Sequence, residues 1–302
     1  MTEAGPTKAD AFEAHRRHLT GLAYRMLGSL ADAEDVVQEA FMRFDAATGI
    51  RDVRAFLTTV TTRLALDTLR SARRRREDYV GPWLPEPIVD GAGLWDQGDE
   101  AMAHDASVAL LLALERLTPL ERAAFILHDV FALGFAEVAA TLGRSEAACR
   151  QLAVRARGHV REARPRATVA PEQAARVTEA FFAAASSGDA TALRAMLASD
   201  AVLVSDGGRR RFAAVNPIRG AERITRFYAG IARKWGDTTW WSPCRVNGMP
   251  GYVSAFDGGR VQATALEIDG EHVARIYRML NPDKLASAIR LVPPGHGVAR
   301  TA

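Results

Sequence analysis

Helical periodicity in this sequence stops at two segments that no helix can cross. Residues 79–105 are rich in Pro and Gly, and residues 165–171 begin and end with Pro. Proline lacks an amide hydrogen and clashes with the preceding turn, so neither segment can form the interior of a helix. The sequence therefore predicts helical parts over residues 10–78 and 106–165, a linker over 79–105, and a separate part beyond residue 171.

The two helical parts carry apolar residues at amphipathic spacing. Helices are expected near residues 11–27, 31–44, 54–77, 107–117, 118–131, 135–143 and 146–164. Thr118, Pro119 and Glu121 indicate a helix start, because they provide an N-cap, a first-turn proline and a capping-box partner. The short turn Gly143-Arg144 joins two helices at helix-turn-helix spacing.

Beyond residue 171 the pattern changes. A helix is expected over residues 172–198 and another over 220–234, with strand-like segments at 201–205, 238–246, 251–257, 260–268 and 272–280. A helix followed by several short strands is typical of an α+β domain, here placed at residues 172–290.

Charge is distributed unevenly along the chain. The formal net charge is only +3, yet residues 54–77 hold seven Arg against one Asp and one Glu, and residues 144–166 hold seven Arg against two Glu. Two separate basic stretches favour two contacts with a polyanion. The alternative for either stretch is the solvated face of an Arg-rich helix.

Each basic stretch suits a different form of nucleic acid. A helix-turn-helix places the start of its second helix in the major groove of a duplex. The stretch 54–77 combines Thr hydroxyls, Arg side chains and leucines, which suits phosphates and the unstacked bases of an opened strand, unless it is a Thr-rich core helix. The acidic helix 31–44 would repel phosphate, so it suits a protein partner or is an ordinary surface helix.

The order of these parts resembles the extracytoplasmic-function sigma factors of bacterial RNA polymerase. The motifs are DAEDVVQEAF, RAFLTTVTTRLALDTLRSARRRRE and LTPLERAAFILHDVFALGFAEVAATLGRSEAACRQLAVRARGHV, in order over residues 10–165. The resemblance implies a region 2 helical bundle (8–78) and a region 4 helix-turn-helix domain (106–165). It also implies that the protein binds core polymerase, through its β′ and β subunits, and promoter DNA.

The resemblance also implies roles for particular residues, motif by motif. Region 2.2 docks on the β′ clamp helices, with the candidates Asp32, Asp35, Gln38, Glu39 and Phe41. The segment that melts and reads the -10 element supplies Thr62, Arg63, Asp67, Arg70, Arg73 and Arg74. The helix that reads the -35 element supplies Arg144, Ser145, Glu146, Arg150, Gln151, Arg155 and Arg157. Many members have Asn where this chain has Arg63, so the -10 sequence that it reads is not carried over.

The last third resembles the SnoaL-like, NTF2-like domain, a curved sheet packed with helices around a conical pocket. WLPEP (83–87), DGGRR (206–210) and NPDKL (281–285) are similar to motifs of the SigJ-type group, whose members carry this extension. Related members often have DGGGK where this chain has DGGRR. The expected fold is thus multidomain, with two all-α sigma domains and a C-terminal α+β NTF2-like cone.

The segment GPWLPEP places two large apolar side chains among three prolines, and a solvated linker would not need them. We expect Trp83 and Leu84 to pack on the C-terminal domain near DGGRR or NPDKL, with packing on region 4 or simple spacing as the alternatives. Proline lowers the entropy lost when such a segment docks. The expected regulatory residues are Trp83, Leu84, Pro85, Asp206, Gly207, Gly208, Arg210, Asn281, Pro282, Asp283 and Lys284.

Other functions are weaker alternatives. NTF2-like domains can be enzymes, and the polar candidates for such a pocket are Asp206, Tyr252, Asp257, His272 and Tyr277. No acid–base pair is specified by spacing, so we expect a regulatory domain, with a small-molecule ligand left open, rather than an enzyme. A DNA-binding regulator that works without polymerase would leave the acidic helix unexplained.

Composition adds several expected absences. The two cysteines, Cys149 and Cys244, are too few for a disulfide framework, and the histidines show no ligand spacing, so no metal or other cofactor is expected. No apolar run is long enough to span a bilayer and the N-terminus lacks an apolar signal core, which favours a cytoplasmic protein that does not bind membranes.

Overall fold

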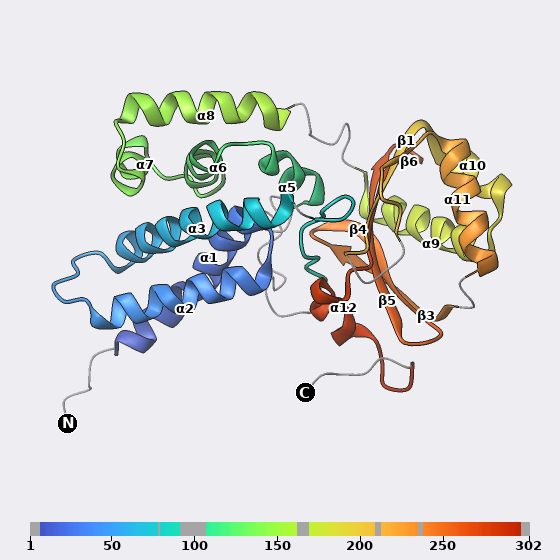
Figure 1. Ribbon diagram of the computed structural model, residues 1–302, viewed down its shortest axis with the longest axis horizontal. Helices are drawn as coiled ribbons and strands as arrows, with labels where there is room; N and C mark the ends of the chain where they lie inside the picture. The colour runs from blue at the N-terminus through green and yellow to red at the C-terminus, as the bar shows by residue number, and fades with distance from the viewer. Residues whose placement is uncertain are drawn as a thin grey trace. The chain divides into compact units, whose positions relative to one another are not determined.

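The chain forms two compact units, each of which combines segments far apart in the sequence. The computed structural model describes residues 7–77, 79–90, 107–161, 169–208, 213–234 and 238–296. Unit 1 comprises Met1–Asp78 and Leu111–Ala163, and unit 2 comprises Tyr79–Leu110 and Arg164–Ala302 (Figure 1). The segment expected to be a linker therefore belongs to the same unit as the C-terminal domain.

Unit 1 is helical, as the periodicity predicts. Its helices are α1 (Lys8–Leu27), α2 (Leu30–Ala46), α3 (Val53–Glu77), most of α5 (Val108–Glu115), α6 (Pro119–Phe125), a π-helical segment (Ile126–Val130), α7 (Phe135–Leu142) and α8 (Glu146–Arg161). The predicted helix start at Thr118 is confirmed. The Thr118 side chain accepts from the Glu121 amide, and the Glu121 carboxylate accepts from the Thr118 amide.

A buried arginine joins the two sequence segments of unit 1. The Arg122 guanidinium donates to the carbonyl oxygens of Leu114, at 2.9 Å, and Met26, at 2.7 Å, and pairs with Glu115 at 2.8 Å. Its side chain is almost fully buried. A buried charge of this kind is tolerated because its donors are satisfied, and here they fix the end of α1 against α5 and α6.

Unit 2 is a curved mixed sheet with helices. Its elements are α9 (Pro171–Ser187), α10 (Ala190–Met196), β1 (Leu197–Asp206), β2 (Ile218–Arg219), α11 (Ala221–Lys234), β3 (Thr238–Val246), β4 (Met249–Phe256), β5 (Arg260–Asp269), β6 (His272–Met279), a 3₁₀ turn (Pro282–Lys284) and α12 (Ala286–Leu291). The expected α+β arrangement is confirmed for the residues that the structure describes.

The described strands form one sheet in the order β2-β1-β6-β5-β4-β3. β1 and β6 are parallel neighbours, and the other described pairs are antiparallel. Irregular register interrupts β1, β3 and β5, and such bulges bend a strand and increase its twist. The bent sheet packs on α9, α10 and α11 through a core that includes Phe181, Leu203 and Ile224 (Figure 1).

The predicted single helix over residues 172–198 is wrong. Gly188 ends α9 in the left-handed region, at φ 71°, and Asp189 caps α10 by accepting from two amides. A Cβ on Gly188 would approach Ala232 Cβ to 2.9 Å, so the break also lets α11 pack closely. The sequence reasoning also missed β2, the 3₁₀ turn and α12, which are too short to show a clear period.

Within the described residues, no helix is both long enough and apolar enough to cross a membrane.

Acid sensitivity is expected from a histidine in unit 1. His18 is half-buried with its ring edge-on to Phe131, 4.7 Å between centroids. Burial, assisted by the charges of Arg54, His15 and Arg25, lowers the pKa of His18 to about 4. Folded His18 thus stays neutral while the unfolded side chain takes up a proton, so stability is lost as pH falls from about 6.5 to about 4.

The substitution His18→Phe keeps the ring and removes the titration. We expect this variant to lose less unfolding free energy than the wild type between pH 7 and pH 4.5, as measured by urea denaturation. His272→Phe, at an exposed position, is the control and should follow the wild type. Equal acid dependence in His18→Phe and wild type would contradict this origin of the acid sensitivity.

Candidate regulatory and nucleic-acid interfaces

The described part of the linker, residues 79–90, pairs with the end of the sheet in unit 2. Val89 forms an antiparallel bridge with Val246, the last residue of β3. The Asn247 amide donates to the Ile88 carbonyl at 2.7 Å, and its side-chain oxygen accepts from the Ile88 amide at 3.2 Å. Asn247 has φ 52° in the Asn-Gly turn between β3 and β4, which is the dipeptide that favours such a turn.

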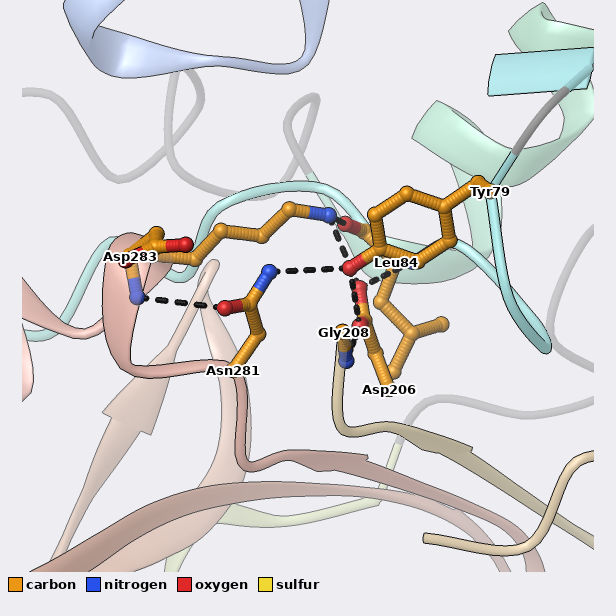
Figure 2. A network of polar contacts seen from close by, with 7 residues as sticks. Tyr79, Leu84, Asp206, Gly208, Asn281 and Asp283 are labelled. Carbon is orange, nitrogen blue, oxygen red and sulfur yellow. Dashed lines mark hydrogen bonds and ion pairs between the residues drawn. The ribbon is translucent and has the colours of Figure 1, made fainter. Parts of the chain in front are cut away.

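A single buried carboxylate accepts two hydrogen bonds from the linker. Asp206, at the end of β1, is 1% exposed. Its oxygens accept from the Tyr79 hydroxyl at 2.5 Å and the Leu84 amide at 2.9 Å, both in the linker. They also accept from the Gly208 amide at 3.0 Å and the Lys284 ammonium at 2.8 Å. Figure 2 shows these groups converging on Asp206.

Residues of the segment 281–287 also bind the linker. The Asn281 amide nitrogen donates to the Tyr79 hydroxyl at 2.9 Å, and Lys284 donates to the Leu84 carbonyl at 2.6 Å (Figure 2). The Ser287 hydroxyl donates to the Pro87 carbonyl at 2.5 Å. All three motifs noted in the sequence thus meet in one network, with Lys284 as the counter-charge of Asp206.

The apolar contact of the linker is made mainly by Leu84, which is fully buried. Trp83, which we expected to pack beside Leu84, is half-buried, and the Lys284 ammonium lies 4.3 Å from its ring centroid. Ile88 and Val89 are buried as well. Burial of one leucine contributes about 1.5–3 kcal/mol, so these side chains together supply the apolar part of docking.

The backbone at Gly208 requires glycine. Its φ is 57°, and a Cβ there would lie 2.7–2.9 Å from the side-chain atoms of Asn281. Gly207 and Pro85 are buried, and Pro282 and Asp283 form the 3₁₀ turn that Asn281 caps through the Asp283 amide, at 3.1 Å. Arg210 lies outside the described residues.

The sequence reasoning missed Tyr79, Asn247 and Ser287 as members of this network. Burial, together with the hydrogen bond to Asp206 and the charge of that carboxylate, raises the pKa of the Tyr79 hydroxyl far above its usual value. The hydroxyl therefore remains a donor to Asp206 at physiological pH. Only Asn247 had a sequence signal, the Asn-Gly turn dipeptide.

In unit 1 the start of α8 exposes the residues expected at the -35 element. Arg144, Ser145, Glu146, Arg150 and Gln151 are all exposed. Arg150 pairs with Glu146 at 2.7 Å, and its guanidinium lies 5.3 Å from the Phe135 ring centroid.

The two remaining -35 candidates are held in ion pairs. Arg155 pairs with Glu121 at 3.1 Å, and Arg157 pairs with Asp129 at 2.6 Å.

The residues of α3 that are candidates for the -10 element differ in how far their side chains are buried. Thr62 is fully buried and its hydroxyl donates to the Thr58 carbonyl, so the expectation that it lies at the DNA surface is corrected. Arg63, Asp67 and Arg70 are exposed, and the last two pair at 3.1 Å. Arg63 donates to the carbonyls of Ala140 and Thr141 at the end of α7. Arg73 and Arg74 lie on α3, but their side chains are outside the described part.

The acidic helix α2 carries the candidates for polymerase contact on its outer side. Asp35 and Gln38 are exposed, and Asp32 and Glu39 are half-buried. Phe41 is half-buried against Phe12, with 4.8 Å between ring centroids. The helix therefore offers carboxylates and an amide beside a partly covered aromatic ring.

The polar candidates for catalysis do not share a site. Asp206 lies in the linker network, whereas Asp257 and His272 are exposed at turns. Tyr252 faces the helices, and Tyr277 contacts Glu267. Among the described residues, no cluster of His, Cys, Asp or Glu could hold a metal ion.

Removal of the Asp206 charge should release the linker. Asp206→Asn keeps the size of the side chain but leaves Lys284 without its counter-charge. Breaking a buried pair typically costs about 3–5 kcal/mol. We expect hydrogen exchange at the Leu84 and Ile88 amides to rise by about 100-fold, measured by mass spectrometry on the full chain.

Asp257→Asn, at the exposed turn in the same unit, is the matched control and should leave this exchange unchanged. The double variant Asp206→Asn with Lys284→Met should lose less protection than the sum of the single variants, because it leaves no buried charge unpaired. Unchanged exchange in Asp206→Asn would show that the linker is held by its apolar contacts instead.

Known proteins match both units. Residues 11–75 match the family model Sigma-70 region 2, and residues 107–160 match Sigma-70, region 4. The chain is 41% identical to the ECF RNA polymerase sigma factor SigJ of Mycobacterium tuberculosis, over 95% of this chain and 97% of that one. It is 35% identical to SigI of the same species, over 94% and 97% of the two chains.

A solved structure agrees with the sequence matches. The crystal structure of Mycobacterium tuberculosis SigJ superimposes with a TM-score of 0.74 at 38% identity, and covers 92% of this chain and 98% of its own. The likeness therefore extends through the C-terminal sheet as well as the helical regions. With both sigma regions matched and the full length shared with such relatives, the chain belongs to the extracytoplasmic-function sigma factors of RNA polymerase.

Proposed function

We propose that unit 2 controls this sigma factor by binding the linker between its two promoter-reading regions. The observation that carries the proposal is the network around Asp206, which attaches residues 79–90 to the C-terminal domain. Sigma regions 2 and 4 read promoter elements that are separated along the DNA. Docking of the linker therefore limits how far the chain between them can extend, and release lengthens it.

Region 4 is proposed to read the -35 element with the exposed start of α8. Arg144, Arg150 and Gln151 can reach base edges or phosphates there, since an arginine can donate two parallel bonds to guanine and Gln can do so to adenine. Arg155 and Arg157 are proposed phosphate contacts, which set affinity and register rather than sequence.

Region 2 is proposed to open and read the -10 element with α3. Arg63 and Arg70 are the exposed candidates, together with Arg73 and Arg74 farther along the helix. Arg63 must leave the carbonyls of Ala140 and Thr141 before it can contact DNA. Promoter binding would therefore include a step in which the hydrogen bonds between Arg63 on α3 and the end of α7 break.

Binding of core polymerase is proposed to use α2. Asp35 and Gln38 are exposed and suit contacts with basic or polar side chains, while Phe41 supplies an apolar edge. Asp32 and Glu39 lie beside them on the same helix. We propose that such a surface meets the β′ subunit, as the family resemblance implies.

Transcription with purified core polymerase tests the function. The full chain should produce specific run-off transcripts from its target promoter, selected from a promoter library. Arg150→Ala should reduce transcription from promoters with a -35 element by about tenfold, since a lost base contact costs about 1–3 kcal/mol.

Arg226→Ala is the matched control, because Arg226 forms the same kind of exposed ion pair, with Glu222 on α11, in the other unit. It should leave transcription unchanged. Absence of transcripts together with absence of core binding would overturn the proposed roles of α2, α3 and α8.

The control role is tested in the same assay with Asp206→Asn. Release of the linker should change transcript yield severalfold relative to wild type, and the sign of the change identifies unit 2 as inhibitor or activator. Equal yields, in a variant whose hydrogen exchange proves that the linker is released, would overturn control through the linker.

A further inference from the structure

One buried arginine in unit 2 is not explained by the linker network. Arg278, on β6, is 3% exposed. Its Nη2 donates to the Gln262 side-chain oxygen at 2.7 Å, and its guanidinium lies 5.4 Å and 5.5 Å from the ring centroids of Phe227 and Tyr228. Its Nε has no hydrogen-bond partner, and no carboxylate among the described residues pairs with it.

Other unsatisfied polar groups lie on the same face of the sheet. Tyr252, Thr264 and Arg278 are direct cross-strand neighbours on β4, β5 and β6, and Ser254 pairs with Gln262 in the next row. The Ser254 hydroxyl has no hydrogen-bond partner, and the hydroxyls of Thr264 and of Tyr228, which reaches this face from α11, have the Tyr252 hydroxyl as their neighbour. All of these side chains are buried.

Four of these polar side chains border a cavity between the sheet, α9 and α11. Tyr228, Tyr252, Gln262 and Arg278 line it together with apolar side chains that include Phe182 and Phe256. Arg278 is the one charged residue among the described lining residues. The cavity is partly open to solvent and has a volume of about 30 Å³, which exceeds the roughly 10–15 Å³ that one water needs and suits a group of a few heavy atoms.

The missing partner is best supplied by an anion. Arginine stays protonated in proteins, so its charge cannot be removed by titration. A buried charge without a counter-charge is strongly disfavoured, and the two aromatic rings offset only part of that cost. A carboxylate matches the guanidinium because it accepts two parallel bonds, and neighbouring hydroxyls can donate to the same oxygens.

We propose that this cavity binds a small organic monocarboxylate. The carboxylate pairs with Arg278 and accepts from the hydroxyl of Tyr228 or Tyr252, and a short apolar tail lies against Phe182 and Phe256. This inference deepens the proposed control role and rests on it only for its consequence in the cell, because the binding itself involves neither polymerase nor DNA.

Calorimetric titration of the full chain tests the proposal. The probes are acetate, propionate and butyrate, each compared with its neutral amide and with sodium chloride at equal ionic strength. We expect saturable binding of at least one carboxylate, with a matching rise in Tm, and no binding of the amides or chloride. The same carboxylate should shift the Arg278 Nε–Hε resonance in the NMR spectrum of the wild type.

The variant Arg278→Met removes the charge and keeps an aliphatic side chain. We expect its Tm without carboxylate to be equal to or above that of wild type, because a buried unpaired charge is gone, and its affinity for the carboxylate to fall about tenfold or more. Arg226→Met, at an exposed position, is the control and should bind as wild type does. Tyr228→Phe, which removes one hydroxyl, should weaken binding severalfold and serves if Arg278→Met does not fold.

Three results would overturn the proposal: no carboxylate binds the wild type, the amide binds as well as the carboxylate, or Arg278→Met binds unchanged. A resonance of Arg278 that moves with inorganic phosphate but with none of the carboxylates would also overturn it. Transcription with core polymerase is measured separately. If no carboxylate binds, the proposed sigma function is unaffected. If no transcript forms, the proposal that the cavity binds a carboxylate is unaffected.

Discussion

The arrangement of unit 2 depends on the ion pair between Asp206 and Lys284. Both groups are largely shielded from water, where the attraction between opposite charges is strong and the cost of losing one partner is high. Each group also bonds to the linker, because Asp206 accepts from the Leu84 amide and Lys284 donates to the Leu84 carbonyl. One pair of charges therefore attaches Leu84, which lies 122 positions before Asp206 and 200 positions before Lys284 in the sequence.

Much of this organisation could be predicted from local patterns. The helices of unit 1 follow from apolar periodicity and from the capping residues around Thr118, and the short motifs were sufficient to expect that the linker meets Asp206 and Asn281. The relative weight of Trp83 and Leu84 could not be predicted, because size and hydrophobicity do not say which side chain points inward. The burial of Thr62 was hidden for a similar reason, since threonine is common both in cores and at surfaces.

Contacts between segments far apart in the sequence also could not be predicted. The parallel contact of β1 with β6 and the bridge between Val89 and Val246 join segments with no sequence signal for each other. The same is true of Arg278, whose polar neighbours come from three strands and a helix. The chain runs from Arg278 on β6 through Leu280 to Asn281, so three peptide bonds connect a residue of the cavity with a residue of the linker network.

The distance in sequence between the linker and its binding site has a consequence for the newly made protein. Both promoter-reading regions have been synthesised by about residue 163, but Asn281 and Lys284 come about 120 residues later. At about 5–20 residues per second, this interval lasts roughly 6–24 s. β1 must also wait for its parallel partner β6, so the docking surface cannot form early. Every nascent chain on the ribosome thus passes through a period in which Leu84 and Ile88 are uncovered and unit 1 exists without a complete unit 2.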